Sequence, residues 1–417
     1  MVLWQRILLA ANEGELRMNA DIQQTKNIGT KREAGLDLLR LLAMMMVVVL
    51  HYLGKGKLLP DLSGETLGNT GVTAWLLESF CIVAVNTYML ISGYFLSQSS
   101  FKVNRLIQLW LQIWVYSVGF GLLGALSGIV VETPVDIHYF LTLFFPISMG
   151  HYWFMSAYVY LYLLLPLVGI AVRHMSKKQM QWSIGLLLFA YSILKSVLPL
   201  RLELDAQGYD AMWYLCVFLL AAYVRKFGIC FLEKKDSGEK SRNGFGLLMY
   251  FGGALFVFGG LMGMRALYLE TGSFQRMLKM SMEYNHVFVL VASLGLFVAF
   301  KNLKVVPKLA AIAKAIAPHA LGVYLLHENI GLRYTWQNWL GANRIETVPE
   351  LIAGVLVAVV VVFTCGILID VVRKYLFDIV HKVGMKTKPY RKLCEVIEKA
   401  DQLFACEGEN RVSESGK

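Results

Sequence analysis

The segment that decides the fold is Gly35–Tyr52, which reads GLDLLRLLAMMMVVVLHY. It is apolar apart from a few positions, and as an α-helix it would extend roughly 27 Å, close to the thickness of a bilayer's hydrocarbon core. Two ionisable side chains, Arg40 and His51, lie inside this apolar stretch. The segment therefore predicts a membrane-spanning helix with side chains that take part in catalysis or ligand binding.

The whole chain has the composition of a membrane protein. Of its 417 residues, 57% are hydrophobic and 17% charged, whereas soluble domains average about 45–50% and about 25%. Apolar runs long enough to cross a bilayer recur through the sequence. We therefore predict an all-α, polytopic membrane bundle of about ten transmembrane helices, at residues 36–53, 73–96, 106–131, 152–171, 181–198, 211–224, 245–264, 285–300, 311–329 and 350–372.

The formal net charge of +11 comes from basic residues in short segments between the apolar runs. This distribution argues against a nucleic-acid partner, which would need basic residues gathered on one soluble face. If the N-terminus is cytoplasmic, 30 of the 40 Lys and Arg residues lie on the inner side, nine toward the outer side, and Arg40 within the first span. Since inner loops of membrane proteins are enriched in Lys and Arg, we predict that both termini are cytoplasmic.

We divide the chain into three parts. Residues 1–34 are polar and unpatterned and are expected to form a disordered cytoplasmic segment; Met18 is an alternative start. Residues 35–375 are expected to form the membrane domain, and residues 376–417 a basic, amphipathic cytoplasmic tail that lies along membrane lipids. We find no phosphate-binding loop and no Cys or His cluster in the sequence, and therefore expect no metal cofactor.

Arg40 and His51 are expected to face one cavity. Eleven residues at about 100° each return a helix to within about 20° of the same face, with an axial separation of roughly 16 Å. An ionisable group inside a span is costly, at least about 2.5–3.5 kcal/mol, and is usually functional. Each residue taken alone also has a structural explanation. Arg40 could reach the inner headgroups, and His51 could cap the outer end of the helix. Neither explains why they share a face.

The spacing Arg40-x10-His51 resembles the first-helix motif of the acyltransferase-3 family of integral membrane enzymes. The likeness extends over about residues 35–375, although Lys102 stands where that family has arginine. Lysine does not clamp a phosphate with a forked contact as arginine does. Four further stretches are similar to landmarks of the family: Asn86–Phe95, Tyr152-Trp153-Phe154, Trp213-Tyr214 and Gly322–Asn329.

The resemblance implies an O-acyltransferase of the type that modifies bacterial surface polysaccharides. It would take an acetyl or other short acyl group from cytoplasmic acyl-CoA to a hydroxyl of a glycan or glycolipid. In this role His51 is the expected general base, since its unperturbed pKa is near neutrality. Lys102, Arg105 and Arg40 are expected to bind the donor's phosphates, and Arg40 also to take part in catalysis.

The outer ends of other spans are expected to complete the site. Glu328 is placed to orient the imidazole of His51 or share its proton. Trp153, His151 and His327 lie at a similar depth and are expected to contact the acceptor, because sugars pack against aromatic rings. A belt of residues that anchors the helices at the membrane interface explains the same aromatic positions.

Two other functions remain open from the sequence. A transporter or flippase of a lipid-linked glycan would also have about ten spans and a polar cavity. A glycan polymerase fits less well, since the expected outer loops are short. The resemblance implies the inner (plasma) membrane of a bacterium.

Overall fold

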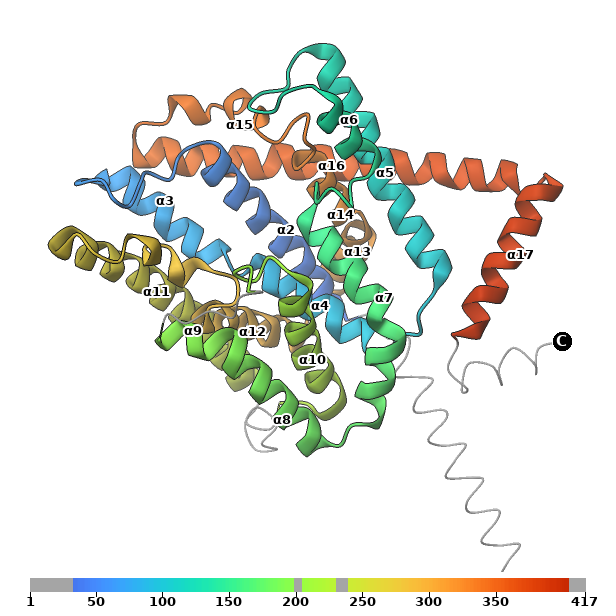
Figure 1. The fold of residues 1–417 in the computed structure, drawn as a ribbon, viewed down its shortest axis with the longest axis horizontal. Helices are drawn as coiled ribbons and strands as arrows, with labels where there is room; N and C mark the ends of the chain where they lie inside the picture. Colours follow the sequence, from blue (N-terminus) through green and yellow to red (C-terminus); the bar gives the residue numbers. More distant parts are fainter. Residues whose placement is uncertain (1–32, 199–204, 230–238, 405–417) are drawn as a thin grey trace, which may run out of the picture. The chain divides into compact units, whose positions relative to one another are not determined.

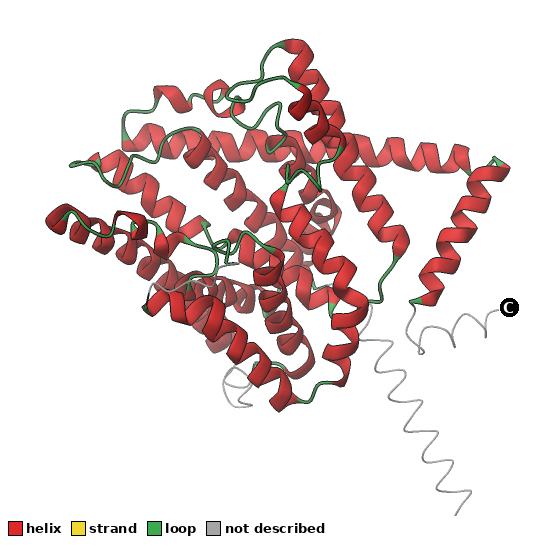
Figure 2. Cartoon of the chain, in the orientation of Figure 1, coloured by secondary structure: helices red, strands yellow, loops and turns green. Residues whose placement is uncertain are grey.

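The computed structural model describes residues 33–198, 205–229 and 239–404. Within these residues every regular element is a helix and no strand is present (Figures 1 and 2). This confirms the predicted all-α class. The predicted disordered segment, residues 1–34, lies outside the described residues except for its last two positions.

The helices follow one another through the chain with few long loops (Figure 1). The α-helices are α2 (Ala34–Lys55), α3 (Gly68–Cys81), α4 (Ala84–Leu96), α5 (Val103–Ser127), α6 (Ile137–Phe144), α7 (Trp153–His174), α8 (Lys177–Leu188), α9 (Leu194–Val197), α10 (Ala211–Phe227), α11 (Glu239–Thr271), α12 (Val287–Lys301), α13 (Pro307–Ile316), α14 (Ala320–His327), α15 (Trp336–Trp339), α16 (Val348–Gly384) and α17 (Lys388–Leu403). The short 3-10 and π elements are η1 (Phe189–Ile193), η2 (Gln275–Met277), η3 (Met280–Met282), η4 (Ala317–His319) and η5 (Ala342–Arg344).

Nine stretches within the described residues are long and apolar enough to cross a membrane. Each contains most of one predicted span, and the second combines α3 and α4. The remaining predicted span, residues 211–224, is α10, a helix of 17 residues. At 1.5 Å per residue α10 is roughly 26 Å long, slightly short of a typical hydrocarbon core. The predicted polytopic helical membrane bundle is therefore confirmed.

Local sequence signals explain where several helices begin and end. Ser176 and Gln179 form a capping box at the start of α8, and Thr347 forms the same motif with Glu350 at the start of α16. These side chains bond backbone N–H groups that have no partner inside a helix. Gly128 ends α5 with a left-handed backbone conformation at φ 70°, which glycine adopts without a steric penalty.

The core is formed by α2 and the helices around it. Most side chains of α2 are buried, including Leu36, Leu39 and Val48, and they belong to one large apolar cluster. The pair α11 and α12 packs with little space between backbones, because a Cβ added at Gly246 would lie 2.7 Å from the carbonyl oxygen of Gly295. Small residues at a helix interface are typical of membrane bundles, where close van der Waals contact replaces the hydrophobic effect.

Loops that the sequence assigns to one side of the membrane lie together. Lys57 and Glu132, from the first two predicted outer loops, form an ion pair at 2.6 Å. Lys226 donates to the backbone carbonyl of Arg173 at 2.9 Å, which joins two predicted inner segments. The alternation of sides is therefore consistent with the fold, while the side that faces the cytoplasm stays a prediction.

The last long helix extends beyond the predicted domain boundary. α16 continues past residue 375 to Gly384, since nothing in the sequence breaks the helix earlier. α17 then covers much of the described tail as a separate helix with no buried residue. Exposed apolar side chains such as Val396 and Leu403 lie on it, and the contact of this tail with membrane lipids stays a prediction.

Candidate functional site

Helix α2 carries two polar side chains into a single cavity. Arg40 and His51 both line a cavity of about 1310 Å³, with Met44 and Val47 between them on the same face. Helices α4, α5, α7, α14, α16 and α17 supply the other walls. The common face expected from an eleven-residue separation is therefore present in the fold.

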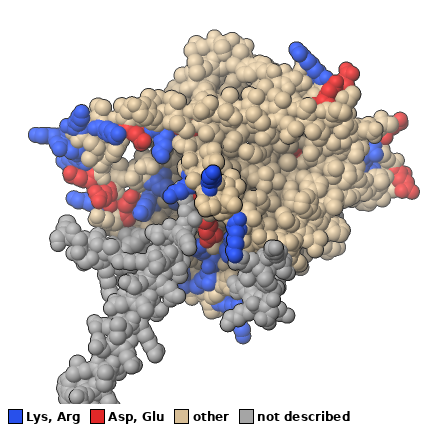
Figure 3. All heavy atoms as spheres, turned by 180° about the vertical axis from the view of Figure 1, so that it is seen from behind, with Lys and Arg blue, Asp and Glu red and all other residues tan. Residues whose placement is uncertain are grey.

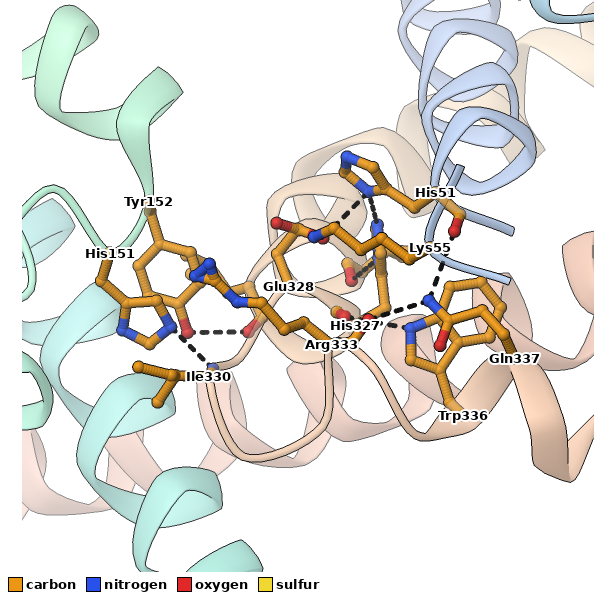
Figure 4. Close-up of polar contacts among 12 residues, drawn as sticks. His51, Lys55, His151, Tyr152, His327, Glu328, Ile330, Arg333, Trp336 and Gln337 are labelled. Atoms are coloured by element: carbon orange, nitrogen blue, oxygen red, sulfur yellow. Dashed lines mark hydrogen bonds and ion pairs between the residues drawn. The ribbon is translucent and has the colours of Figure 1, made fainter. Parts of the chain in front are cut away.

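At one end of the cavity His51 contacts the end of α14. Its Nδ1 lies 2.8 Å from Nε2 of His327 and 3.2 Å from Oε1 of Glu328. The ammonium of Lys55, one helical turn after His51, pairs with the same Glu328 carboxylate. Figure 4 shows the side chains of His51 and Lys55 pointing from α2 toward His327 and Glu328. The result is a compact group of two imidazoles, one carboxylate and one ammonium.

The hydrogen bonds of His327 determine where the protons lie when both rings are neutral. Its Nδ1 is 2.6 Å from the carbonyl oxygen of Val323, which only accepts, so Nδ1 carries the proton and Nε2 accepts. The N–H donor to that Nε2 is then Nδ1 of His51. This leaves Nε2 of His51 unprotonated, and it has no hydrogen-bond partner among the described residues. A side chain that lines the cavity thus presents a basic nitrogen.

The short helix α15 holds both histidines by their backbones. Gln337 Nε2 donates to the carbonyl oxygen of His51 at 3.3 Å, and Trp336 Nε1 donates to that of His327 at 3.1 Å (Figure 4). The hydroxyl of Tyr52 donates to the carbonyl of Leu340 at 3.0 Å. Such contacts fix the positions of the rings that form the site.

Arg40 lies on the same helix as His51 but nearer the start of α2. Its guanidinium pairs with Asp37 at 3.1 Å, and the Tyr88 hydroxyl donates to its backbone carbonyl at 2.7 Å. Arg105 on α5 also lines the cavity and donates weakly to the Tyr158 hydroxyl at 3.4 Å. The cavity thus contains the imidazole of His51 at one end and guanidinium groups farther along.

Comparison with known proteins identifies the family of the chain. A family model described as an acyltransferase domain, that of acyltransferase-3, matches residues 33–369 of the 417-residue chain. The chain belongs to the acyltransferase-3 family. No curated protein and no solved structure matched the chain. Membership of the acyltransferase-3 family makes the protein a membrane acyltransferase and favours an enzyme over the transporter considered above.

Several residues that the sequence singles out in this acyltransferase-3 chain lie together. His51, His327 and Glu328 form one group, although His327 and Glu328 stand behind His51 rather than lining the cavity themselves. Trp153 lines the cavity and stacks with Tyr284, with ring centroids 5.7 Å apart. A planar aromatic wall of this kind suits the apolar face of a sugar ring.

Two other expected site residues lie outside the cavity. Lys102 is exposed, and its backbone N–H and C=O groups both contact the Tyr162 hydroxyl. His151 is buried, with Nδ1 3.1 Å from Ser117 Oγ and Nε2 accepting from the N–H of Ile330 at 2.8 Å. Both ring nitrogens of His151 are therefore used within the protein. Burial lowers the pKa of His151 to about 3, so the ring is neutral near pH 7, and the geometry suits a structural role.

Sequence reasoning did not single out Lys55 or Asp370. Lys55 follows His51 by four residues, and that spacing places both on one helix face. Asp370 lies in the last predicted span and is completely buried, where it accepts from His319 Nδ1 at 2.7 Å and Gln112 Nε2 at 2.9 Å. An ionisable residue inside a membrane span is usually functional, which is why the sequence analysis selected Arg40. The same reasoning applies to Asp370.

The ligand atoms of His51, His327 and Glu328 lie within 4.8 Å of one another, close enough to hold a metal ion. His327 donates its other ring nitrogen to a carbonyl, as metal-bound histidines commonly do. However, Lys55 is paired with the same carboxylate, and an ammonium at that distance repels a metal cation. The electrostatics of this group thus favour proton transfer over metal binding.

Proposed function

We propose that the protein is a membrane O-acyltransferase that transfers an acetyl or other short acyl group from cytoplasmic acyl-CoA to a hydroxyl of a cell-surface polysaccharide or glycolipid. The observation that supports this best is the free Nε2 of His51 in a cavity that also contains Arg40 and Arg105. The imidazole of His51 is suited to accept a proton, and the guanidinium groups of Arg40 and Arg105 are suited to contact an anionic acyl donor. We further propose that it acts in the plasma membrane of a bacterium.

His51 is the general base of the proposed reaction. Its Nε2 removes the proton of the acceptor hydroxyl as the oxygen attacks the thioester carbonyl. The resulting imidazolium is stabilised by Nε2 of His327 and by the carboxylate of Glu328. When the tetrahedral intermediate collapses, the carbon–sulfur bond breaks, the thiolate leaves, and the proton on His51 passes to sulfur. The products are an ester and free CoA thiol.

Arg40 and Arg105 serve the donor in this proposal. An acyl-CoA carries several phosphates, and arginine binds a phosphate with two parallel hydrogen bonds. The arginines line the same cavity as His51, and Arg40 lies roughly 16 Å along the helix axis from it. A thioester on a long, flexible arm can therefore reach the imidazole while the phosphates stay near the guanidinium groups. Lys102, which does not line the cavity, would contribute less.

Trp153 and Tyr284 provide the acceptor subsite. The two rings stack, and Tyr209 packs against both with centroids 4.6 Å away. Because aromatic faces bind the C–H face of a sugar without selecting one hydroxyl, this wall fits a glycan acceptor. His151 has no free ring nitrogen and is not needed in this subsite.

Replacement of His51 tests the proposed function. We expect His51→Ala to lower acyl transfer by about a hundredfold or more, which is the usual contribution of a general base. The apolar helix is kept, so the protein should still insert and accumulate. Ester-linked acyl groups on the cell's glycan are measured by mass spectrometry, and protein by immunoblot of membranes. His138→Ala, which replaces an exposed histidine outside the cavity, is the matched control. Undiminished acylation in the His51 variant would exclude it as the base.

A further inference from the structure

The cavity continues beyond the residues matched by the family. The match ends at residue 369, but the cavity is also lined by Arg373, Lys374 and Phe377 of α16 and by several residues of α17. These groups line the same continuous space as Arg40 and Arg105. This second part of the cavity is a candidate binding site in its own right.

Arg373 is held rigidly at this position. Its Nε and Nη2 donate to the two carboxylate oxygens of Asp370 at 2.7 and 3.1 Å, and its guanidinium lies 5.0 Å from the ring centroid of Phe377. The side chain is only 15% exposed. Nη1 has no partner among the described residues. A partly buried guanidinium with a fixed plane and a free N–H edge is prepared to bind an anion, because little entropy is lost on contact.

Lys374 adds a second positive charge beside Arg373. It is exposed, lines the cavity, and forms no ion pair within the part of the chain that the structure describes. Arg105 contributes a third charge from α5, on another wall of the same space. Figure 3 shows Lys and Arg side chains together with Asp and Glu side chains around a hollow at one end of the molecule, next to a broad uncharged surface. Three cations on the walls of one space suit an anion with more than one charge.

Acidic side chains also line this part of the cavity, on both helices. Asp370, which pairs with Arg373, and Asp378 lie on α16 beside the cations. Glu398 and Asp401 of α17 line the cavity, and Asp401 Oδ1 accepts from the backbone N–H of Asn104 at 3.2 Å. These carboxylates do not suit phosphate, but they accept hydrogen bonds from amino and hydroxyl groups. The ring of Tyr390 lines the same region and offers a face on which a base can stack. The site therefore combines cations, aromatic rings and acceptors.

We propose that Arg373 and Lys374 bind the phosphates of the nucleotide part of an acyl-CoA donor, with Tyr390, Glu398 and Asp401 around its adenosine. This assignment rests on the proposed function, because the donor is the one proposed above. It extends the donor site to residues outside the family match, and makes α17 one of its walls. A phosphorylated nucleotide has anionic, aromatic and hydrogen-bond-donating parts, the same classes of group that these residues recognise.

Binding to the full-length protein in lipid nanodiscs tests this site. The probes are coenzyme A, adenosine 3′,5′-bisphosphate and pantethine, which lacks the nucleotide, with affinities from isothermal titration calorimetry. We expect Lys374→Gln to weaken binding of the first two by about tenfold, the loss of one charge-assisted contact, and not to affect pantethine. Arg373→Lys, which keeps a charge beside Asp370 but removes the fork, should weaken the same two probes. Lys382→Gln replaces an exposed lysine of α16 that does not line the cavity, and should bind like the unaltered protein.

The outcomes separate the two proposals. If the unaltered protein binds coenzyme A and both variants bind it equally well, the phosphate site is excluded while the proposed donor stands. If the unaltered protein binds neither coenzyme A nor the bisphosphate, the donor and its site both fail. Weakened binding of all three probes by Lys374→Gln would indicate a general loss of structure and would also overturn the specific assignment.

Discussion

The contact between His51 and His327 places one imidazole behind another. Nδ1 of His51 is close both to an imidazole nitrogen and to the carboxylate of Glu328, at 2.8 and 3.2 Å. Lys55 pairs with that carboxylate and reduces its negative charge. The strength with which Glu328 stabilises a cationic His51 thus depends on a third side chain, because opposite charges in a buried group offset one another.

This dependence leads to a prediction for Glu328. We expect Glu328→Gln to lower acyl transfer by about tenfold or more, because the imidazolium of His51 loses its counter-charge. The substitution also leaves Lys55 as an unpaired, mostly buried cation, which by itself destabilises the fold. Initial rates with labelled acetyl-CoA and isolated membranes provide the measurement.

A double variant separates the two effects. Glu328→Gln combined with Lys55→Met removes the lone ammonium and should restore normal protein levels. If Glu328 acts on His51, activity stays low in the double variant. Recovery of full activity there would mean that Glu328 only neutralises Lys55 and has no part in the chemistry.

At the scale of helices, the position of His327 depends on the packing of α14 against α16. Nδ1 of His327 donates a hydrogen bond to the carbonyl oxygen of Val323. Val323 lies directly against Gly366 of α16. A Cβ added at Gly366 would be 2.6 Å from the Cα atom of Val323. The two backbones therefore touch at the residue that orients the imidazole.

We predict that Gly366→Ala disturbs this contact. One added methyl group must push the helices apart, and overpacking of this kind costs about 1–3 kcal/mol. The thermal unfolding midpoint in detergent should fall, as measured by differential scanning fluorimetry. Gly252→Ala in α11, where no atom lies within 4 Å of the added Cβ, is the control. Equal midpoints for the two variants would show that the α14–α16 contact yields without cost.

At the scale of the whole molecule, contacts between loops sort the chain into two sides. The ion pair of Lys57 with Glu132 and the contact of Lys226 with Arg173 connect segments that the distribution of Lys and Arg assigns to the same side. The proposed mechanism also needs the correct absolute orientation. Arg105 and Lys374 must face the compartment that contains acyl-CoA.

Labelling of cysteines tests this orientation. In a background without the native cysteines, Val135→Cys in the loop before α6 should react with an impermeant thiol reagent in intact cells. Lys178→Cys near the start of α8 should react only after permeabilisation, because it lies in a predicted inner segment. The modified fraction is measured by a mass shift on gels. The opposite pattern would place the donor site outside the cell and exclude the proposed use of cytoplasmic acyl-CoA.

The sequence alone determined the properties that depend on local chemistry. Apolar length predicted the spans, and helical periodicity placed Arg40 and His51 on one face, since both follow from the chain within one helix. Even the proximity of Glu328 to His51 was expected from the similar depth of two helix ends. These features need no knowledge of which helices pack together.

Only the tertiary structure decided which distant groups meet. His327 lies behind His51 and does not line the cavity. Both ring nitrogens of His151 are bonded, to Ser117 and Ile330, and Lys102 lies outside the cavity. Contacts between residues hundreds of positions apart depend on the close fit of helices around small residues, which no local pattern encodes. The same packing brings Arg373 and residues of α17 to the wall of the cavity, and the sequence had singled out none of them for the site.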